Sequence, residues 1–158
     1  MNYILQDKDL YATLADAERK LFSSERFKFE KSQMWRSNTI PNNSGVYALF
    51  EERDKLLYVG ETGNLRLRMN DINRTVNHSF RKQLGLSRFG GIKSRKKFSE
   101  EIELQLDLFY MNNLHVSFIE VNFGRLEIET FIITNNQTQL LNSEKKRKVE
   151  LKIISADN

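Results

Sequence analysis

Two short β-rich segments, separated by five charged residues, constrain the fold of this chain most strongly. Residues 45–50 (GVYALF) and 56–60 (LLYVG) consist mainly of aliphatic, β-branched and aromatic residues, and they flank the segment EERDK. Two such runs joined by a short polar segment are typical of a β-hairpin. We therefore predict an antiparallel hairpin whose tip lies near Arg53 and Asp54.

The register of this hairpin decides which side chains share a face of the sheet. With the turn centred at the predicted tip, Tyr47 lies opposite Gly60, and Leu49 lies opposite Tyr58. Direct cross-strand partners share a face, as do residues two positions apart on one strand. Tyr47 and Tyr58 are therefore predicted to lie diagonally on one face, with Gly60 leaving space beside Tyr47. Two core aromatic residues with hydroxyls at the surface would give the same pattern, and a one-residue change in the turn would remove it.

Helical spacing and capping residues predict helices at four places along the chain. Apolar residues recur at intervals of three and four within residues 7–23. Ser99 precedes three glutamates, and an N-cap followed by acidic residues is favourable at the positive end of a helix dipole. Shorter helices are expected over residues 64–74 and 78–86.

Three further segments are less uniform. Residues 114–121 read as a strand. Residues 25–36 are ambiguous, because Phe27 and Phe29 alternate as in a strand but the pattern does not continue. Residues 125–135 favour a strand by their β-branched content and a helix by the spacing of their apolar residues.

The order of these elements predicts an α+β fold, with a small sheet built on the hairpin and flanked by helices. A chain of 158 residues is long enough for about one domain. The polar turn that begins at Pro41 divides the chain. We expect an N-terminal helical arm (residues 1–40), a central domain (41–142) and a charged C-terminal tail (143–158).

Composition excludes several classes of protein and site. The chain has no cysteine, so disulfide scaffolds and thiolate metal sites are excluded. It has only two histidines, so we do not expect a His-rich zinc site. No segment reaches the about 20 apolar residues that cross a bilayer, and the first residues do not resemble a secretion signal. We expect a cytoplasmic protein without a membrane partner.

Basic residues are concentrated in the middle of the chain. Between Thr62 and Ser99 there are ten basic residues and one acidic residue, a net charge of +9 in a chain of net charge +4. Such a block is typical of contact with a phosphate backbone, although a solvated surface gives the same pattern. The residues predicted to contact nucleic acid are Arg66, Arg74, Arg81, Lys82, Arg88, Lys93, Arg95, Lys96 and Lys97.

Short motifs follow one another in a fixed order from the hairpin onward. Gly45-Val46-Tyr47 lies on the first strand and Tyr58-Val59-Gly60 on the second. Asn64-Leu65 and Arg68 then form an N-L-x-x-R pattern at the predicted start of a helix. With these motifs the chain resembles the GIY-YIG nuclease superfamily.

Two downstream segments extend the resemblance. Residues 129–133 (ETFII) are similar to the family's glutamate helix, and Leu141-Asn142 is similar to its terminal leucine-asparagine, without the proline that usually precedes it. Glu127 competes with Glu129 for the glutamate position, and the two lie about 200° apart on a helix, so only one can face the tyrosines. The spacing to the two isoleucines favours Glu129.

The resemblance implies a GIY-YIG-type sheet and a metal-dependent endonuclease that cleaves DNA, with RNA not excluded. It implies that Glu129 binds Mg²⁺ or Mn²⁺ and that Arg68 neutralises charge on the phosphoryl oxygens. Tyr47 could act as a base only if nearby cations lower its pKa from about 10. Tyr58 would position the water or the phosphate.

Two further residues enter through the same resemblance. In some relatives a histidine after the arginine helix helps to activate water, which would be His78, although this residue could also contact a phosphate or cap a helix. Asn142 would hold the site together by hydrogen bonds.

Two alternatives to this hypothesis remain open. The first is a nucleic-acid-binding module that has kept the fold without cleavage. In the second, the N-terminal arm docks on a partner protein, and removal of residues 1–36 would leave the core folded. A homodimer is also expected if the enzyme cuts both strands.

Overall fold

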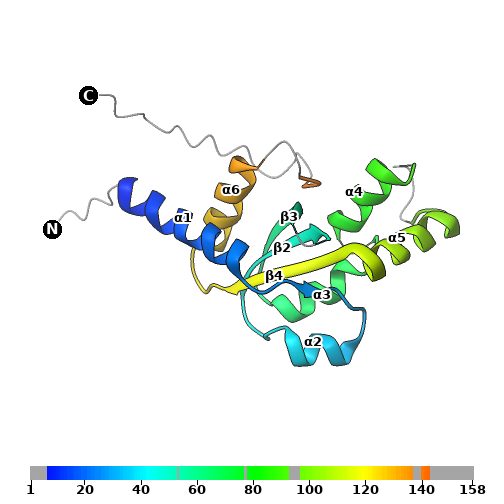
Figure 1. The fold of residues 1–158 in the computed structure, drawn as a ribbon, viewed down its shortest axis with the longest axis horizontal. Helices are drawn as coiled ribbons and strands as arrows, with labels where there is room; N and C mark the ends of the chain where they lie inside the picture. The colour runs from blue at the N-terminus through cyan, green and yellow to red at the C-terminus, as the bar shows by residue number, and fades with distance from the viewer. Residues whose placement is uncertain (1–6, 53, 77, 93–96, 137–139, 143–158) are drawn as a thin grey trace.

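The computed structural model describes residues 7–52, 54–76, 78–92, 97–136 and 140–142. Within these residues the chain forms an α+β fold with a four-stranded antiparallel sheet (Figure 1). In chain order the elements are α1 (Asp7–Ser23), β1 (Phe27–Lys28), α2 (Gln33–Thr39), β2 (Gly45–Glu51), β3 (Lys55–Thr62), α3 (Leu65–Ile72), α4 (Ser79–Arg88), α5 (Glu100–Asn113), β4 (Leu114–Glu120) and α6 (Arg125–Asn135). The predicted fold class is confirmed.

The strands lie in the order β1-β4-β2-β3, so β2 is central and β3 is an edge strand. Tyr47 pairs with Gly60 and Leu49 pairs with Tyr58, which is the register predicted from the sequence. The register then shifts, because Phe50 pairs with Leu56. This bulge lies between the two tyrosines and the hairpin tip, so it does not disturb their shared face.

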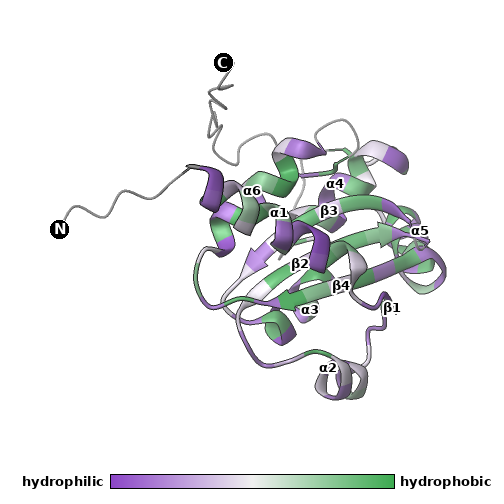
Figure 2. Ribbon diagram, turned by 60° about the vertical axis from the view of Figure 1, so that its left-hand side comes forward, coloured by the Kyte–Doolittle hydropathy of each residue, from purple (hydrophilic) through white to green (hydrophobic). Residues whose placement is uncertain are grey.

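Helices cover both faces of the sheet. On one face, α1 and α6 pack against alternate residues of β2 and β3, among them Val46, Ala48 and Val59. On the other face, Tyr47 and Tyr58 belong to a cluster that includes residues of α3, α4 and α5. Figure 2 shows hydrophobic residues along the strands, between these helical layers. Burial of both faces explains why β2 is a continuous apolar run rather than an alternating one.

The N-terminal segment is integrated into this packing. Leu14 and Leu21 of α1 are buried against the sheet, and the Ser117 hydroxyl of β4 donates to the Leu21 carbonyl at 3.0 Å. β1 pairs with β4, and Phe29 is buried on the opposite face. Removing residues 1–36 would therefore expose apolar surface on both faces of the sheet. That the core stays folded without them remains an untested prediction, which this packing does not favour. The domain boundaries remain predictions, and the tail 143–158 lies outside the described residues.

The two segments whose secondary structure the sequence left ambiguous form different structures. Residues 25–36 contain both structures, with β1 followed by α2, whose N-cap Ser32 accepts a hydrogen bond from the Trp35 amide. Residues 125–135 form the helix α6, because Ile128 and Ile132 then point together into the core. No helix in the described part of the chain has the length and apolar character needed to span a membrane.

Candidate active site

Two buried tyrosines lie on the face of the sheet that α3, α4 and α5 cover. The rings of Tyr47 and Tyr58 stack with centroids 6.3 Å apart, and both side chains are almost completely buried. Their placement follows from the hairpin register, since the two residues are diagonal neighbours on adjacent strands.

Gly60 allows the Tyr47 ring to cross the edge strand. A Cβ atom at Gly60 would lie 2.3 Å from both Cζ and Oη of Tyr47. The phenol therefore occupies the space predicted beside this glycine, and its hydroxyl lies directly over β3. At this position the absence of a side chain is required by the close approach of Tyr47.

We expect Gly60→Ala to destabilise the protein by about 1–3 kcal/mol, the usual cost of inserting a methyl group into a packed site. A displaced Tyr47 hydroxyl should also lower any cleavage rate by about a hundred-fold. Gly63→Ala is the matched control, because nothing lies within 4 Å of a Cβ at Gly63. Denaturant unfolding and cleavage assays measure the two effects. Equal stability and activity of the two variants would contradict the packing described here.

His78 connects the Tyr47 hydroxyl to the start of α4. It is the N-cap of that helix, and its Nδ1 accepts the Phe80 amide hydrogen at 3.1 Å. Since a backbone amide can only donate, Nδ1 carries no proton and the neutral ring is protonated on Nε2. Nε2 lies 2.9 Å from the Tyr47 hydroxyl. His78 therefore donates to the oxygen of Tyr47 and leaves the phenolic proton free to point elsewhere.

The surroundings of Tyr47 raise the pKa of its hydroxyl well above the usual value. Burial is the largest cause, followed by Tyr58; Arg68 acts in the opposite direction, and Glu129 and Glu61 raise the pKa further. The expectation that Arg68 lowers the pKa is confirmed in direction, but burial outweighs it. The same interactions show that Arg68 and Glu129 lie close enough to Tyr47 to act on its charge.

The two glutamates of α6 differ in their surroundings. Glu129 is 2% exposed, whereas Glu127 lies on the exposed side of the helix. Only Glu129 is among the groups that act on the Tyr47 hydroxyl. The structure thus distinguishes two candidates that the sequence left in competition.

Arg68 is half-buried on α3, and its Nε atom is buried without a hydrogen-bond partner among the described residues. A buried guanidinium N–H without an acceptor is costly, and a phosphate oxygen would satisfy it. Arg68 therefore keeps one unsatisfied donor among the described residues, and its charge acts on the Tyr47 hydroxyl.

Asn142 attaches the end of the described chain to the edge strand. Its Nδ2 donates to the Val59 carbonyl at 2.7 Å, and its Oδ1 accepts from the Val59 amide at 3.2 Å. The Leu141 amide also donates to the Leu57 carbonyl. These contacts hold β3 between Tyr58 and Gly60, and the role of Asn142 in holding the site together stays a prediction.

Sequence reasoning missed three residues that complete this region. The Ser79 hydroxyl pairs with the Tyr58 hydroxyl at 3.0 Å, and Arg125 forms an ion pair with Glu61 at 3.0 Å. Ser79 directly follows His78 and could have been noticed for that reason. No sequence signal connected Arg125 with Glu61, because the pair forms only when α6 packs on the sheet.

The predicted basic residues separate into several groups. Arg66 donates to the carbonyls of Ile40 and Ser37, and Arg88 is paired with Glu51. Exposed or partly exposed positions are held by Arg74, Lys82 and Lys97. Lys93, Arg95 and Lys96 lie outside the described residues.

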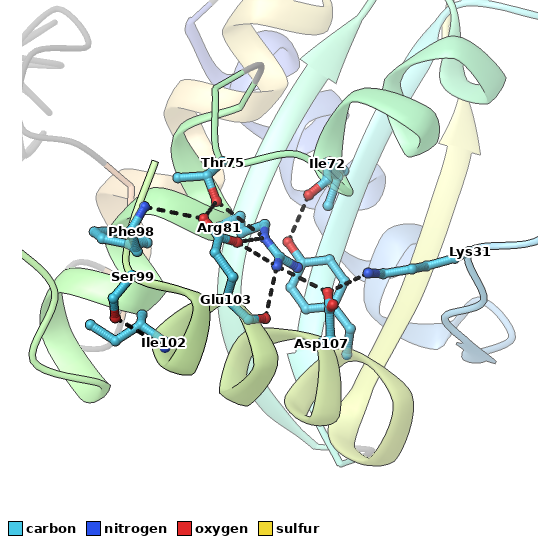
Figure 3. A network of polar contacts seen from close by, with 10 residues as sticks. Lys31, Ile72, Thr75, Arg81, Phe98, Ser99, Ile102, Glu103 and Asp107 are labelled. Carbon is cyan, nitrogen blue, oxygen red and sulfur yellow. Dashed lines mark hydrogen bonds and ion pairs between the residues drawn. The ribbon is translucent and has the colours of Figure 1, made fainter. Parts of the chain in front are cut away.

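Arg81 is 3% exposed and forms ion pairs with Glu103 and Asp107, whose side chains are 25% and 46% exposed (Figure 3). Its guanidinium joins α4 to α5, and Thr75 donates to the same Glu103 carboxylate. The prediction that Arg81 contacts nucleic acid is not supported by this position, because acidic side chains of the protein already neutralise it.

The described side chains of this site could bind a hard divalent cation only together with water and substrate phosphate. The described residues contain no group of three acidic or histidine side chains that could hold a metal ion alone. Mg²⁺ is commonly bound through one or two carboxylates together with water and substrate phosphate. Glu129, a buried carboxylate that acts on the charge of the Tyr47 hydroxyl, fits that mode of binding.

Comparison with known protein families gives one match for this chain. A family model described as GIY-YIG catalytic domain matches residues 43–145, which is more than half of the chain. The matched range begins just before β2 and includes Asn142. No curated protein and no solved structure gave a match.

Proposed function

Because the chain belongs to the GIY-YIG catalytic domain family, a family of nucleases, we propose that it is a metal-dependent endonuclease that hydrolyses phosphodiester bonds in DNA. The observation that carries this proposal is the convergence on the Tyr47 hydroxyl. His78 hydrogen-bonds to it, Tyr58 stacks on its ring, and charged groups of α3 and α6 act on its pKa.

Hydrolysis requires that a water molecule lose a proton as it attacks phosphorus. A neutral phenol cannot accept this proton, so we assign its acceptance to the phenolate form of Tyr47, which forms when the phenol releases its own proton to solvent. In the substrate-free protein its raised pKa keeps Tyr47 a neutral phenol. The Nε2–H group of His78 stabilises a phenolate at Tyr47, and Arg68 favours the same charged form. In this mechanism His78 is a hydrogen-bond donor to the base and not itself the base.

Arg68 and Tyr58 act on the phosphate. The Arg68 guanidinium neutralises charge that grows on the phosphoryl oxygens in the transition state. Tyr58, whose hydroxyl is held by Ser79, positions the phosphate or the water by hydrogen bonding. A divalent cation held by Glu129 would polarise the phosphate and stabilise the leaving oxygen.

We expect Arg68→Ala to lower the saturating rate of magnesium-dependent plasmid nicking by about 10²–10³-fold, the usual loss when one transition-state donor is removed. Arg74→Ala is the control, because Arg74 is exposed and would contact only the backbone. It should weaken binding without a matching loss of saturating rate. A similar loss of saturating rate in Arg68→Ala and Arg74→Ala would contradict the proposed role of Arg68 in the transition state.

We expect His78→Asn to keep the fold and lower the cleavage rate by about 10–100-fold. Asparagine is a good N-cap and can accept the Phe80 amide, but it does not reproduce the bond from Nε2 to Tyr47. His78→Ala should lose both functions and about 1 kcal/mol of stability. Thermal unfolding and nicking assays on both variants separate the two roles. Full activity of His78→Asn would show that the histidine only caps the helix.

The alternative is a nucleic-acid-binding module that does not cleave. Wild-type protein that binds DNA but never nicks it with Mg²⁺ or Mn²⁺ would support this alternative. Parallel assays with DNA and RNA of one sequence determine the substrate. A homodimer, a partner protein and a cytoplasmic location remain predictions.

A further inference from the structure

Phe123 is the most exposed large apolar side chain in the described residues, at 95% exposed. It lies in the short connection between β4 and α6 (Figure 1). Leu126, in the first turn of α6, is also exposed, at 47%. An isolated apolar residue on a surface needs no explanation. Phe123 differs from such an isolated residue in two respects. Hydrogen bonds hold the turn that carries it, and the sheet register limits its distance from the candidate site.

The connection that carries Phe123 is held on both sides. The Ser44 hydroxyl donates to the Val121 carbonyl at 2.7 Å, and the Val121 amide donates to the Ser44 carbonyl at 3.0 Å. On the other side, Arg125 donates to the Asn122 carbonyl at 3.1 Å. Hydrogen bonds thus hold the backbone at Val121 and Asn122, before Phe123, and the side chain of Arg125, after it. The phenyl ring itself is exposed to solvent.

Gly124 and Arg125 connect the end of this turn to the edge strand β3. Gly124 has a φ of 82°, a left-handed conformation that favours glycine and begins α6 abruptly. Arg125 then forms its ion pair with Glu61, which directly follows Gly60 and acts on the Tyr47 hydroxyl.

The sheet register gives the separation between the turn and the site. Gly45 pairs with Glu120 of β4 on one side and with Thr62 of β3 on the other. Two strand spacings and two residues along β3 therefore place the start of the turn about 12 Å from Gly60. Phe123 lies three residues beyond Glu120, and three residues span at most about 10 Å, so its backbone lies within about 22 Å of Gly60. At about 3.4 Å per nucleotide step, this limit corresponds to about six nucleotides.

We propose that Phe123 stacks on a nucleobase a few nucleotides from the phosphate that Tyr47 faces. This inference rests on the proposed function and adds a substrate contact outside the reacting groups. A phenyl ring carries no hydrogen-bonding group, so it contacts the face of any base and is tolerant of sequence. Because hydrogen bonds hold the turn on both sides, stacking needs little ordering of the backbone, and the entropy cost is mainly that of the ring itself.

The test is binding of a DNA oligonucleotide, containing the fluorescent base 2-aminopurine at successive positions, to the full chain in EDTA. Stacking quenches the emission of this base, and anisotropy of an end label gives the affinity. We expect Phe123→Ala to weaken binding by about ten-fold and to abolish quenching at one or two positions. Phe123→Trp should keep both the affinity and the quenching.

Met34→Ala is the matched control, because Met34 is 74% exposed on α2 and lies outside the proposed contact. It should bind and quench like the wild type. Wild-type affinity and quenching in Phe123→Ala would overturn the inference and leave the proposed function standing. Wild-type protein that neither binds nor cleaves DNA would overturn the proposed function and the inference with it.

Discussion

Glutamine in place of Glu129 is expected to lower phosphodiester cleavage by about a thousand-fold or more while leaving DNA binding and folding nearly unchanged. The substitution keeps the size of the side chain and removes its charge. Glu129 is buried on α6 and acts on the charge of the Tyr47 hydroxyl. In the proposed mechanism its carboxylate would hold the cation, so its neutral isostere should lose cleavage. Single-turnover cleavage with Mg²⁺ measures the loss.

Glu127→Gln provides the control on the same helix. Glu127 is exposed and lies on another side of α6, so its substitution should change the cleavage rate by less than about two-fold. Metal binding gives a second readout, since Mn²⁺ titrated into a protein–DNA mixture should bind more weakly to Glu129→Gln. Equal cleavage rates of Glu129→Gln and Glu127→Gln would contradict the assignment of Glu129 as the metal ligand.

Arg81→Met is expected to destabilise the protein by about 3 kcal/mol, the lower end of the range for breaking a buried ion pair. Arg81 is 4% exposed in its side chain, and the Glu103 carboxylate that it neutralises is 25% exposed. Methionine fills similar volume but leaves Glu103 without its cation. Denaturant unfolding measures the change. Lys82→Met, at the next position of α4, should change stability by less than about 0.5 kcal/mol.

The effect of Arg81→Met should depend on pH. Burial acts to raise the pKa of Glu103, but hydrogen bonds from Arg81 and Thr75 outweigh it, and the pKa lies below its usual value. A carboxyl with a lowered pKa stabilises the fold above its unfolded pKa of about 4.3 and loses that contribution as the pH falls. The difference in free energy of unfolding between the wild type and Arg81→Met should therefore become smaller below about pH 4. A difference that stays constant into acid would contradict this origin of the stability.

Local patterns in the sequence predicted the parts of the fold that depend on near neighbours. The pairing of Tyr47 with Gly60 followed from the alternation of the two strands and the length of the turn, because side-chain direction in a strand has a period of two. Ser99 caps α5 as predicted, since capping needs only the backbone amides that follow.

Other features could not be read from local pattern. The β-branched residues of α6 favour a strand, but packing against the sheet buries Ile128 and Ile132 on one side of a helix. In the sequence, Arg81 is one of several cations in a basic block. Its ion pair with Glu103 forms only because α5 packs beside α4.

The sequence by itself determined the hairpin, its register and the order of the motifs, because these depend on residues close together along the chain. The spacing to the isoleucines favoured Glu129, but only the tertiary structure shows that Glu129 is buried and acts on Tyr47 while Glu127 is exposed. Only the tertiary structure shows that His78 donates to Tyr47 and that Arg66, Arg81 and Arg88 are paired within the fold. These outcomes depend on which helix faces which side of the sheet. That choice is set by the burial of apolar surface from residues far apart in sequence, and a local pattern does not record it.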